Sequence, residues 1–542
     1  MTAPRRRLGG WGFDGERLEP SAQLLAWLGE RIGPAEHPQP EAAAPPPDAS
    51  AAGLGRLPLE LSADPLDRLA HARGQGLVDV LRLRYGLVPA LPDAVGRPRD
   101  AEEVAATLAA CSERGVRVVP WGGGTSVTGG VNVLAGDAPL LSLDLEHLAG
   151  CASVDRRSRL AVFGPGTRGP GVEAALAAHG LTLGHFPQSF ELATVGGWVA
   201  TRSSGQESLG YGRIEDMVAG LELVAPAGRL RLRARPASAA GPDLRQLVMG
   251  SEGRLGVITE ITLRVRSRPA ATEVAGALLP DPERGMEAVR GLVQGGVPLT
   301  MVRLSDPAET EVAMAVGLGR SRLSWLLDRY LALRGVGAGS CLLLVGAAGD
   351  RDRIGDALAD AAELVAAHRG VSLGRRPGRH WLRDRFRHPY LRESLLDLGY
   401  ATDTLETAAT WSEAAGLRAT IGSAIESALE GDGERVTALC HLSHPYRDGA
   451  SLYFTFFFRC APDPEATIAR WARIKRAAND ALAAAGATLS HHHGVGQFHA
   501  PWLASEIGAD GVGLLEGAAR RLDPRGILNP HVMLDPEDRL EL

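Results

Sequence analysis

Hydrophobic and polar positions follow two different periods along the chain, and each period predicts its own kind of element. Residues 57–85 repeat apolar positions about every 3.6 residues, which predicts a helix. The segment "RDAEEVAATLAACSERG" has the same period and predicts a helix that ends at Gly115. The apolar run "VRVVP" then predicts a short buried strand. Similar runs predict further strands and an α+β domain up to about residue 268: "PLLSLDL", "RLAVFGPG", "LELVAPAG" and "GVITEITLRVR".

The second half of the chain predicts another sheet. Apolar, β-prone runs occur at "TMVRLSD", "CLLLVGAAG" and "SLYFTFFFR". A long amphipathic helix follows, "EATIARWARIKRAANDALAAAG", with Gly486 as its stop, and "GLLEGAARRLDPRGILNP" predicts a last helix closed by an Asp-Pro turn. Residues 34–53 are rich in Pro and Ala and predict a flexible link. We therefore expect four parts: an N-terminal extension with linker (1–56), a first domain (57–268), a second domain (269–480) and a C-terminal segment (481–542).

Composition narrows the class of protein. A chain of 542 residues is too long for one core, and 45% hydrophobic with 23% charged residues is typical of a soluble globular protein. The net charge of −6 gives no reason to expect nucleic acid or an anionic membrane as partner. The five cysteines form no CxxC pair, and neither a secretory signal nor a long apolar span is visible, so we expect a cytoplasmic protein. Lys475 is the single lysine, so anionic ligands must be held by Arg, His and backbone N–H groups.

Three loops of small residues lie in the first domain, and the first of them follows the predicted strand "VRVVP". The first is "PWGGGTSVTGG", which has neither the spacing of a dinucleotide-binding GxGxxG nor a Walker lysine. Its backbone N–H groups, with Thr125, Ser126 and Thr128, could converge on a diphosphate, although a plain Gly-rich turn is the alternative. The others are "TVGGWVATRSSG" and "GSEGRLGVITE". Three such loops in one domain favour a large, flat, anionic ligand.

These three motifs resemble the FAD-binding domain of the vanillyl-alcohol oxidase and p-cresol methylhydroxylase superfamily, and within it the alkyldihydroxyacetonephosphate synthase family. The resemblance implies an α+β fold, with a two-subdomain FAD-binding domain plus a cap domain that has an antiparallel sheet and flanking helices. No Cys or His occurs in Val116–Gly130, so we expect non-covalent FAD. The implied cofactor-binding residues are Pro120, Trp121, Gly122, Gly123, Gly124, Thr125, Ser126, Gln188, Ser189, Thr194, Gly197, Thr201, Ser203, Ser204, Glu252, Gly253, Gly256, Val257 and Ile258.

The segment "LSHHHGVGQFHAPWL" carries three consecutive histidines. Alternation along an extended segment would put His491 and His493 on one side and His492 on the other. A metal cluster or a surface turn are alternatives, but no carboxylate motif accompanies the histidines, so we predict no metal. The resemblance places all three histidines in the active site, near the flavin and the substrate phosphate. Gln497 and His499 stand where the family has basic residues, which removes a cationic contact expected there.

Three further residues gain a role from the resemblance. Tyr453, in the apolar "SLYFTFFF", would be a core residue on pattern alone, but it aligns with the catalytic tyrosine that accepts and donates the proton. That role requires a lowered phenol pKa. Arg392 would be a solvated helix residue on pattern alone, and it aligns with the substrate-binding arginine. Arg303 lies in a strand, where its charge needs a partner, so we expect it to contact flavin or substrate.

The resemblance implies a transferase reaction. The acyl group of 1-acyl-dihydroxyacetone phosphate is exchanged for a long-chain fatty alcohol, which gives an ether without net oxidation. The resemblance does not decide whether the protein contacts a membrane peripherally or forms a homodimer. An FAD-dependent oxidoreductase of a 2-hydroxy acid such as lactate or glycolate is the alternative, and a binding protein without catalysis is a third reading. The complete "HHHGVG" favours the ether-forming enzyme.

Overall fold

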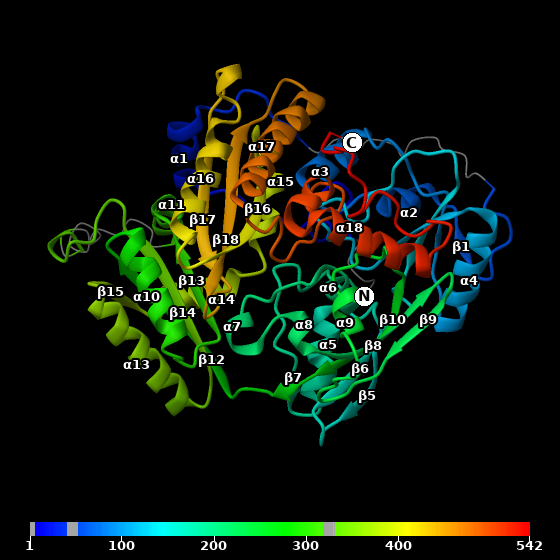
Figure 1. The fold of residues 1–542 in the computed structure, drawn as a ribbon. Coiled ribbons are helices and arrows are strands. Elements are labelled where there is room, and N and C mark those ends of the chain that lie inside the picture. Colours follow the sequence, from blue (N-terminus) through cyan, green and yellow to red (C-terminus); the bar gives the residue numbers. More distant parts are fainter. Residues whose placement is uncertain (1–5, 41–52, 318–328, 330, 542) are drawn as a thin grey trace.

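A computed structural model describes residues 6–40, 53–317, 329 and 331–541 of the chain, and these residues form two lobes (Figure 1). The first lobe contains two larger sheets. In the four-stranded sheet, β2 and β3 pair with β4 in parallel and β1 pairs with β2 antiparallel. The five-stranded sheet is antiparallel, in the order β5-β6-β10-β8-β9. The strands are β1 (Leu61–Ser62), β2 (Ala94–Gly96), β3 (Arg117–Trp121), β4 (Leu140–Asp144), β5 (Cys151–Asp155), β6 (Leu160–Phe163), β8 (Val218–Ala225), β9 (Gly228–Leu232) and β10 (Val257–Arg264).

Short helices surround these sheets, and a two-stranded ribbon, β7 with β11, completes the lobe. The predicted helix that ends at Gly115 is confirmed as α4, because the Asp100 side chain caps its first turn and Gly115 ends it with φ +70°. The remaining elements are α2 (Pro65–Ala70), α3 (Leu77–Tyr85), α4 (Ala101–Arg114), α5 (Gly169–Ala177), α6 (Val195–Thr201), α7 (Ser208–Tyr211), α8 (Ile214–Met217), α9 (Leu244–Val248), β7 (Leu181–Thr182) and β11 (Arg266–Ser267).

The single helix predicted over residues 57–85 is wrong. The structure has β1, α2 and α3 there, with a break at residues 71–76. The break is a long-range contact: the Gln75 N–H donates to the Ser126 carbonyl oxygen at 2.6 Å, and the Gly74 N–H donates to the Asn132 side chain at 3.0 Å. A Cβ on Gly74 would lie 2.4 Å from the Ser126 oxygen. The chain therefore leaves the helix in order to lie against the loop that follows β3.

The second lobe is built on the predicted second sheet, which has seven strands in the order β15-β12-β14-β13-β17-β18-β16. Helices α10, α13, α16 and α17 contribute to the large hydrophobic core on one side of it. The other side faces the cavity described below. The strands are β12 (Ala271–Leu279), β13 (Met301–Ser305), β14 (Cys341–Gly349), β15 (Val371–Gly374), β16 (Tyr400–Thr410), β17 (Val436–Ser443) and β18 (Gly449–Arg459). The helices are α10 (Pro282–Gln294), α11 (Pro307–Gly317), α13 (Arg351–Ala367), α14 (Arg376–Asp384), η1 (His388–Tyr390), α15 (Leu391–Asp397), α16 (Ala414–Ser427) and η2 (Glu430–Asp432).

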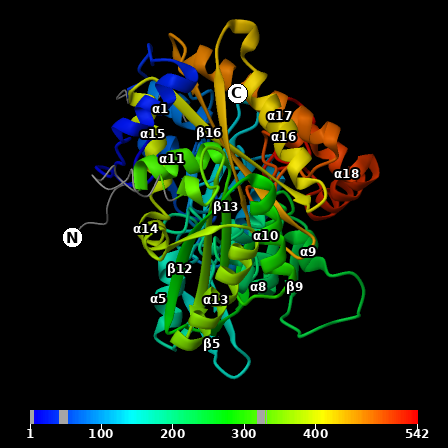
Figure 2. The same ribbon diagram turned by 90° about the vertical axis from the view of Figure 1, so that its left-hand side faces the viewer.

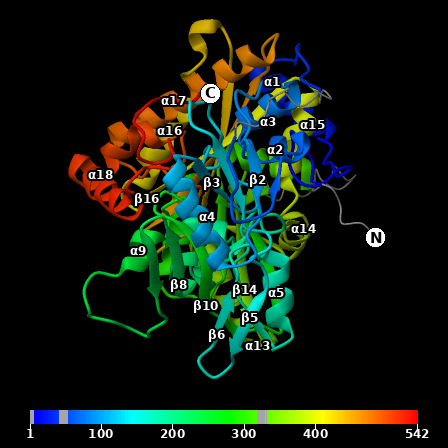
Figure 3. The same ribbon diagram turned by 90° about the vertical axis from the view of Figure 1, so that its right-hand side faces the viewer.

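After the second lobe the chain returns to the first. Helix α17 (Pro464–Ala485) ends at Gly486 with φ +64°, as predicted. A loop of histidines follows, then η3 (Ala500–Trp502) and α18 (Leu503–Leu522). Beyond α18 the backbone joins β3, since the Val118 N–H donates to the Ile527 oxygen at 2.8 Å and the Asn529 N–H donates to the Val118 oxygen at 2.8 Å. Figure 3 shows α18 near α17, with β3 and α4 nearby.

The N-terminal extension also packs on the second lobe. Helix α1 (Ala22–Ile32) lies beside α11 and α15 (Figure 2) and buries Trp27 and Leu28 against Tyr400 and Phe457. Of the predicted link, residues 41–52 lie outside the described residues. Among the described helices, none combines the length and apolar character needed to cross a membrane.

Candidate active site

A cavity of about 1150 Å³ is lined by residues of both lobes. Every residue predicted to bind the cofactor lines it, from Pro120 in the first loop to Ile258 in the third. Arg303, Arg392, Tyr453, His492 and His493 line the same cavity. The structure therefore brings the three small-residue loops and most of the predicted catalytic residues to one space.

In the first loop, Gly122 and Gly123 have no room for a side chain, because other atoms of the protein lie too close. A Cβ on Gly123 would lie 2.3 Å from the Leu192 carbonyl oxygen and 2.8 Å from the Ala193 Cα, and one on Gly122 would lie 2.5 Å from Thr194 Oγ1. The first loop thus packs directly on the second. At Gly123 the backbone of the neighbouring loop therefore already excludes a side chain, whether or not a diphosphate is bound.

Several buried polar atoms in the cavity wall lack a partner among the described residues. They include Gln75 Oε1, Trp198 Nε1 and Gln206 Oε1. A buried polar group without a hydrogen bond is costly, so these atoms indicate a ligand that carries both donors and acceptors. The rim of an isoalloxazine ring and a diphosphate offer both, so the residues present fit FAD.

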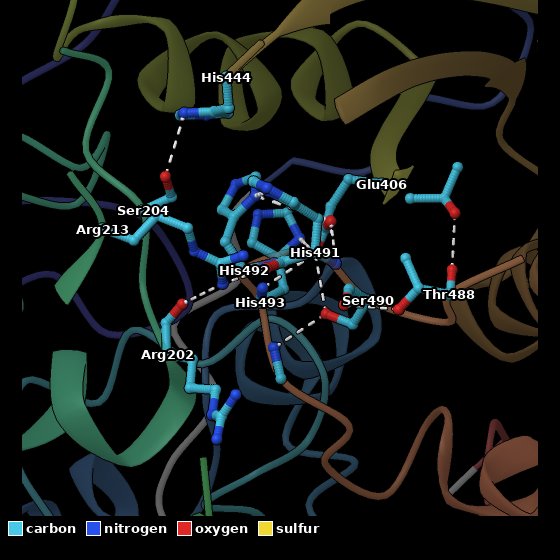
Figure 4. Close-up of polar contacts among 12 residues, drawn as sticks. Arg202, Ser204, Arg213, Glu406, His444, Thr488, Ser490, His491, His492 and His493 are labelled. Carbon is cyan, nitrogen blue, oxygen red and sulfur yellow. Dashed lines mark hydrogen bonds and ion pairs between the residues drawn. The ribbon is translucent and has the colours of Figure 1, made fainter. Parts of the chain in front are cut away.

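The histidine loop, Ser490–Gly496, is held from the second lobe by Glu406 of β16 (Figure 4). The backbone N–H groups of His491, His492 and His493 all donate to its carboxylate, the last two at 3.0 and 2.9 Å. The Ser490 hydroxyl donates to the same group at 2.9 Å. One side chain therefore fixes the backbone of all three histidines.

The first lobe holds the same loop through Glu252, which lies in "GSEG" after α9. Its carboxylate accepts the N–H groups of Val495 at 2.7 Å and Gly496 at 2.9 Å. Arg213 adds a contact from this lobe, because its guanidinium donates to the His491 carbonyl oxygen at 2.7 Å (Figure 4). The loop is thus clamped between two buried carboxylates from opposite lobes.

The two carboxylates differ in charge state. Burial alone would raise the pKa of Glu406, but His493, His491 and the backbone N–H donors lower that pKa to about 2. Burial raises the pKa of Glu252 to about 7, against the lowering effect of its two N–H donors. Glu406 is therefore ionised at neutral pH, whereas Glu252 is close to its titration midpoint.

The three histidines do not alternate as predicted. Residues 491–493 form consecutive bends rather than a strand. His492 and His493 face the cavity, with ring centroids 6.0 and 5.7 Å from that of Tyr453. His491 turns away, and its Nε2 lies 2.6 Å from the Tyr446 hydroxyl. Two of the three histidines, not all three, are thus placed to meet a ligand.

The same loop contains a group of side chains with the composition of a metal site. Ligand atoms of Glu406, His491 and His492 lie within 4.8 Å of one another. However, both carboxylate oxygens of Glu406 already accept N–H groups. The charge of this carboxylate is therefore balanced by the loop itself.

The environment of Tyr453 contradicts one expectation. Burial raises the pKa of Tyr453 to about 12, whereas the proton-accepting role requires a lowered value. Its phenol is protonated at neutral pH and is best suited to donate a hydrogen bond.

The two arginines have partners within the protein. Arg392 on α15 donates to the Gln75 carbonyl oxygen at 2.6 Å and to Glu393 at 2.9 Å, and it still lines the cavity. Arg303 on β13 pairs with Glu309 at 2.7 Å. The partner that its charge requires is thus a carboxylate, and contact with flavin or substrate stays a prediction.

Gln497 and His499 lie away from the cavity. Gln497 donates to the Asn132 carbonyl oxygen at 2.9 Å, and His499 Nδ1 lies 3.0 Å from Asn479 Oδ1. Both side chains are buried and neither lines the cavity. We expected that the replacement of basic residues at these two positions would remove a cationic contact to the ligand. Because neither side chain reaches the cavity, this expectation is wrong.

Sequence reasoning missed the histidines of "HLSH", His441 and His444, which both line the cavity. His444 Nδ1 lies 3.1 Å from the Ser204 hydroxyl and 2.8 Å from that of Ser208. It also missed Glu309 and the anchoring role of Glu406. The two histidines that follow the apolar run "VTALC" were the available signal, although no strand was predicted there.

Comparison with known proteins first shows the class of enzyme to which this chain belongs. Residues 92–232 match the FAD binding domain family, and residues 268–533 match the FAD linked oxidases, C-terminal domain. A structure of p-cresol methylhydroxylase superposes with a TM-score of 0.62 at 14% identity, over 88% of this chain and 94% of that one. The chain is an FAD-dependent enzyme with the predicted α+β fold of the vanillyl-alcohol oxidase type.

Two further comparisons define the family. Alkyldihydroxyacetonephosphate synthase of Dictyostelium discoideum is 31% identical over 484 residues, which are 88% of this chain and 79% of the relative. A solved structure of alkyldihydroxyacetonephosphate synthase superposes with a TM-score of 0.80 at 27% identity, over 97% of this chain and 98% of that one. The chain belongs to the alkyldihydroxyacetonephosphate synthase family.

A substitution at Gly123 tests the contact between the first two loops. We expect Gly123→Ala to lower FAD content severalfold, because the new Cβ displaces the Leu192 backbone and with it the second loop. The flavin absorbance per protein in the purified variant measures this. Gly355→Ala is the matched control, since nothing lies within 4 Å of a Cβ there, and it should keep full occupancy. Wild-type occupancy in Gly123→Ala would contradict the packing.

The pKa of Glu406 predicts a pH-dependent stability. Its folded pKa of about 2 lies below the unfolded value, so its contribution is full above about pH 5 and disappears as the pH falls towards 2. The shift corresponds to roughly 3 kcal/mol. Urea unfolding curves between pH 6 and about pH 3 should show a smaller acid loss of stability in Glu406→Gln than in wild type. The exposed Glu363→Gln is the control, and a wild-type slope in Glu406→Gln would contradict the pKa.

Proposed function

We propose that this enzyme exchanges the acyl group of 1-acyl-dihydroxyacetone phosphate for a long-chain fatty alcohol and so forms an ether lipid precursor. The observation that supports this most is the composition of the cavity, which joins three kinds of wall. The small-residue loops form one wall, and the polar group of Tyr453, His492 and Arg392 forms another. The third wall is apolar and suits alkyl chains: Leu24, Met301, Val302, Val312, Ala313, Met314, Leu342, Leu344, Leu373, Leu439 and Phe457.

Each protein group in this proposal has one task. Bound FAD supplies the redox-capable ring beside which the ester is exchanged for the ether. Arg392 holds the phosphate by charge-assisted hydrogen bonds, and further arginines of α14 line the same cavity. Tyr453, neutral at pH 7, places its hydroxyl at the reacting centre. The apolar wall holds the alkyl chains and excludes water.

The form of the cofactor and the location of the enzyme are also part of the proposal. We infer non-covalent FAD, since Val116–Gly130 contains no Cys or His and none of the cysteines in the described chain lines the cavity. Acid precipitation should release the flavin into the supernatant.

We infer a cytoplasmic enzyme that meets its lipid substrates by peripheral membrane contact, and a homodimer is compatible with this proposal.

A product assay separates this function from the alternative. Purified enzyme is mixed with palmitoyl-dihydroxyacetone phosphate and labelled hexadecanol, without an electron acceptor. We expect labelled alkyl-dihydroxyacetone phosphate and released palmitate in equal amounts. Anaerobic bleaching of the flavin by lactate or glycolate, with no ether product, would instead identify an oxidoreductase of 2-hydroxy acids and overturn the proposal.

The hydroxyl of Tyr453 is expected to matter for turnover but not for folding. Tyr453→Phe keeps an aromatic ring in a β-prone strand, so FAD content and the thermal midpoint should stay close to wild type. The rate of ether formation should fall by about two orders of magnitude or more, the scale of a positioned proton-handling group. Tyr85→Phe, which removes an exposed hydroxyl that donates to the Pro40 oxygen, is the control. Equal rates in the two variants would remove Tyr453 from the reaction.

A further inference from the structure

Residues 6–13, here called the N-terminal strap, form a tight turn beside the first small-residue loop. An antiparallel bridge between the two ends of the strap closes this turn. Trp11, inside the turn, is buried against Leu192 and Tyr390 and lines the cavity. Leu192 belongs to the first lobe and Tyr390 to the second. The strap therefore packs on both lobes at the edge of the cavity.

A buried arginine holds the strap in this position. Arg84 of α3 donates to the Gly9 carbonyl oxygen at 3.0 Å and to Asp397, at the end of α15, at 2.9 Å. The strap also leaves no free space beside η1, because a Cβ on Gly12, with φ +81°, would lie 2.2 Å from the Tyr390 ring. The place of the strap is thus set by specific contacts rather than by chance packing of a chain end.

Arg6 reaches from the strap to the loop that follows β3. Its guanidinium donates to the carbonyl oxygens of Gly123 and Gly124, to the second at 3.2 Å. Burial and the charge of Arg168 lower the pKa of Arg6 to about 10, so the guanidinium is still charged at pH 7. Arg6 therefore binds two successive peptide groups of the loop with a positive charge.

These two hydrogen bonds also fix the direction of the neighbouring N–H groups. In a trans peptide group the C=O and the N–H point in opposite directions. Arg6 does not line the cavity, whereas Gly124 and Thr125 do. Holding the two carbonyl oxygens on the side of the strap therefore turns the N–H groups of Gly124 and Thr125 towards the cavity.

The N–H groups of this loop have no acceptor within the described chain. Residues 122–126 all line the cavity, and none of their backbone N–H groups donates to another described residue. Backbone N–H groups left unpaired in a buried place are costly, and a run of them is typical of a site for an anion. The diphosphate is the anionic part of FAD, so it fits these groups.

The first lobe contributes no arginine or lysine to the wall of the cavity. Residues 57–268 are all described, and those that line the cavity include neither. Arg303 and Arg392, which line it, belong to the second lobe. A diphosphate carries two negative charges, which are costly to remove from water without a compensating charge. Arg6 places such a charge directly behind the loop.

We propose that Arg6 is a positioning residue for FAD. It binds the carbonyl side of the first loop, turns the N–H groups of that loop towards the diphosphate and places a positive charge behind them. The rest of the strap keeps Arg6 in place, since Arg84 and Tyr390 hold it from the two lobes. The inference concerns the cofactor, and it does not depend on which substrate the enzyme converts.

The rate of FAD release tests the charge of Arg6. Holoenzyme is diluted strongly, and free FAD is followed by the rise of its fluorescence. We expect Arg6→Met, which keeps the length of the side chain without its charge, to release FAD about tenfold faster or more, the effect of a lost charge-assisted hydrogen bond. Arg6→Lys should recover most of the wild-type rate. The exposed Arg56→Met is the control and should release FAD as wild type does.

Phosphorus NMR of the bound FAD separates positioning from a tether of the strap. With FAD in excess over its dissociation constant, the two phosphorus resonances in Arg6→Met should move from their wild-type positions towards those of free FAD. The thermal midpoint of the apoenzyme should change little, because Arg84 and Trp11 still hold the strap.

Three results would overturn the inference. The first is release of FAD from Arg6→Met at the wild-type rate. The second is equally fast release from Arg6→Lys and Arg6→Met, which would show that the charge has no part. The third is faster release with unmoved phosphorus resonances, which would leave Arg6 as a tether only. Faster release from Arg6→Met, recovery in Arg6→Lys and shifted resonances together support the positioning role.

Discussion

The binding of one loop by two buried carboxylates is the interaction on which the rest of the site depends. Glu406 and Glu252 together accept five backbone N–H groups from residues 491–496. Burying a carboxylate is costly unless hydrogen bonds replace its water, and each N–H left without a partner costs about 1–3 kcal/mol. The loop and the two carboxylates therefore stabilise one another, and neither is stable in this position alone.

The clamp also explains how a site can be assembled from two lobes. Glu406 belongs to the seven-stranded sheet and Glu252 to a loop of the first lobe, so the histidine loop fixes the distance between the two walls of the cavity. His492 and His493 reach the cavity because their backbone is held from behind. The different pKa values of the two carboxylates follow from their donors, since Glu406 also has the Ser490 hydroxyl and two imidazoles near it.

Sequence patterns predicted local structure well and long-range contacts poorly. Helix α4, strand β3 and helix α17 follow from period, caps and apolar runs within their own segments. The helix expected over residues 57–85 fails because Gly74 and Gln75 bond to the loop around Ser126. The histidines do not alternate because their backbone follows Glu406, which is remote in sequence.

The residues of the candidate site could likewise be predicted from the sequence only where they belong to one continuous motif. The cofactor-binding loops could be predicted because each is a continuous motif. His441 and Glu309 could not, since their pairing depends on helix α11 packing against strand β17, which is remote from it in sequence. Likewise, Gln497 and His499 could be aligned with basic residues, but their burial away from the cavity could not be read from the motif.

The most direct test of the clamp is hydrogen–deuterium exchange of the peptide that contains residues 490–496. If two buried carboxylates hold these N–H groups, the peptide should exchange as slowly as one from the central strand β18. In Glu252→Gln the amides of Val495 and Gly496 should exchange much faster, while β18 stays protected. Rapid exchange of this peptide in the wild-type enzyme, at the rate of an exposed loop, would contradict the account.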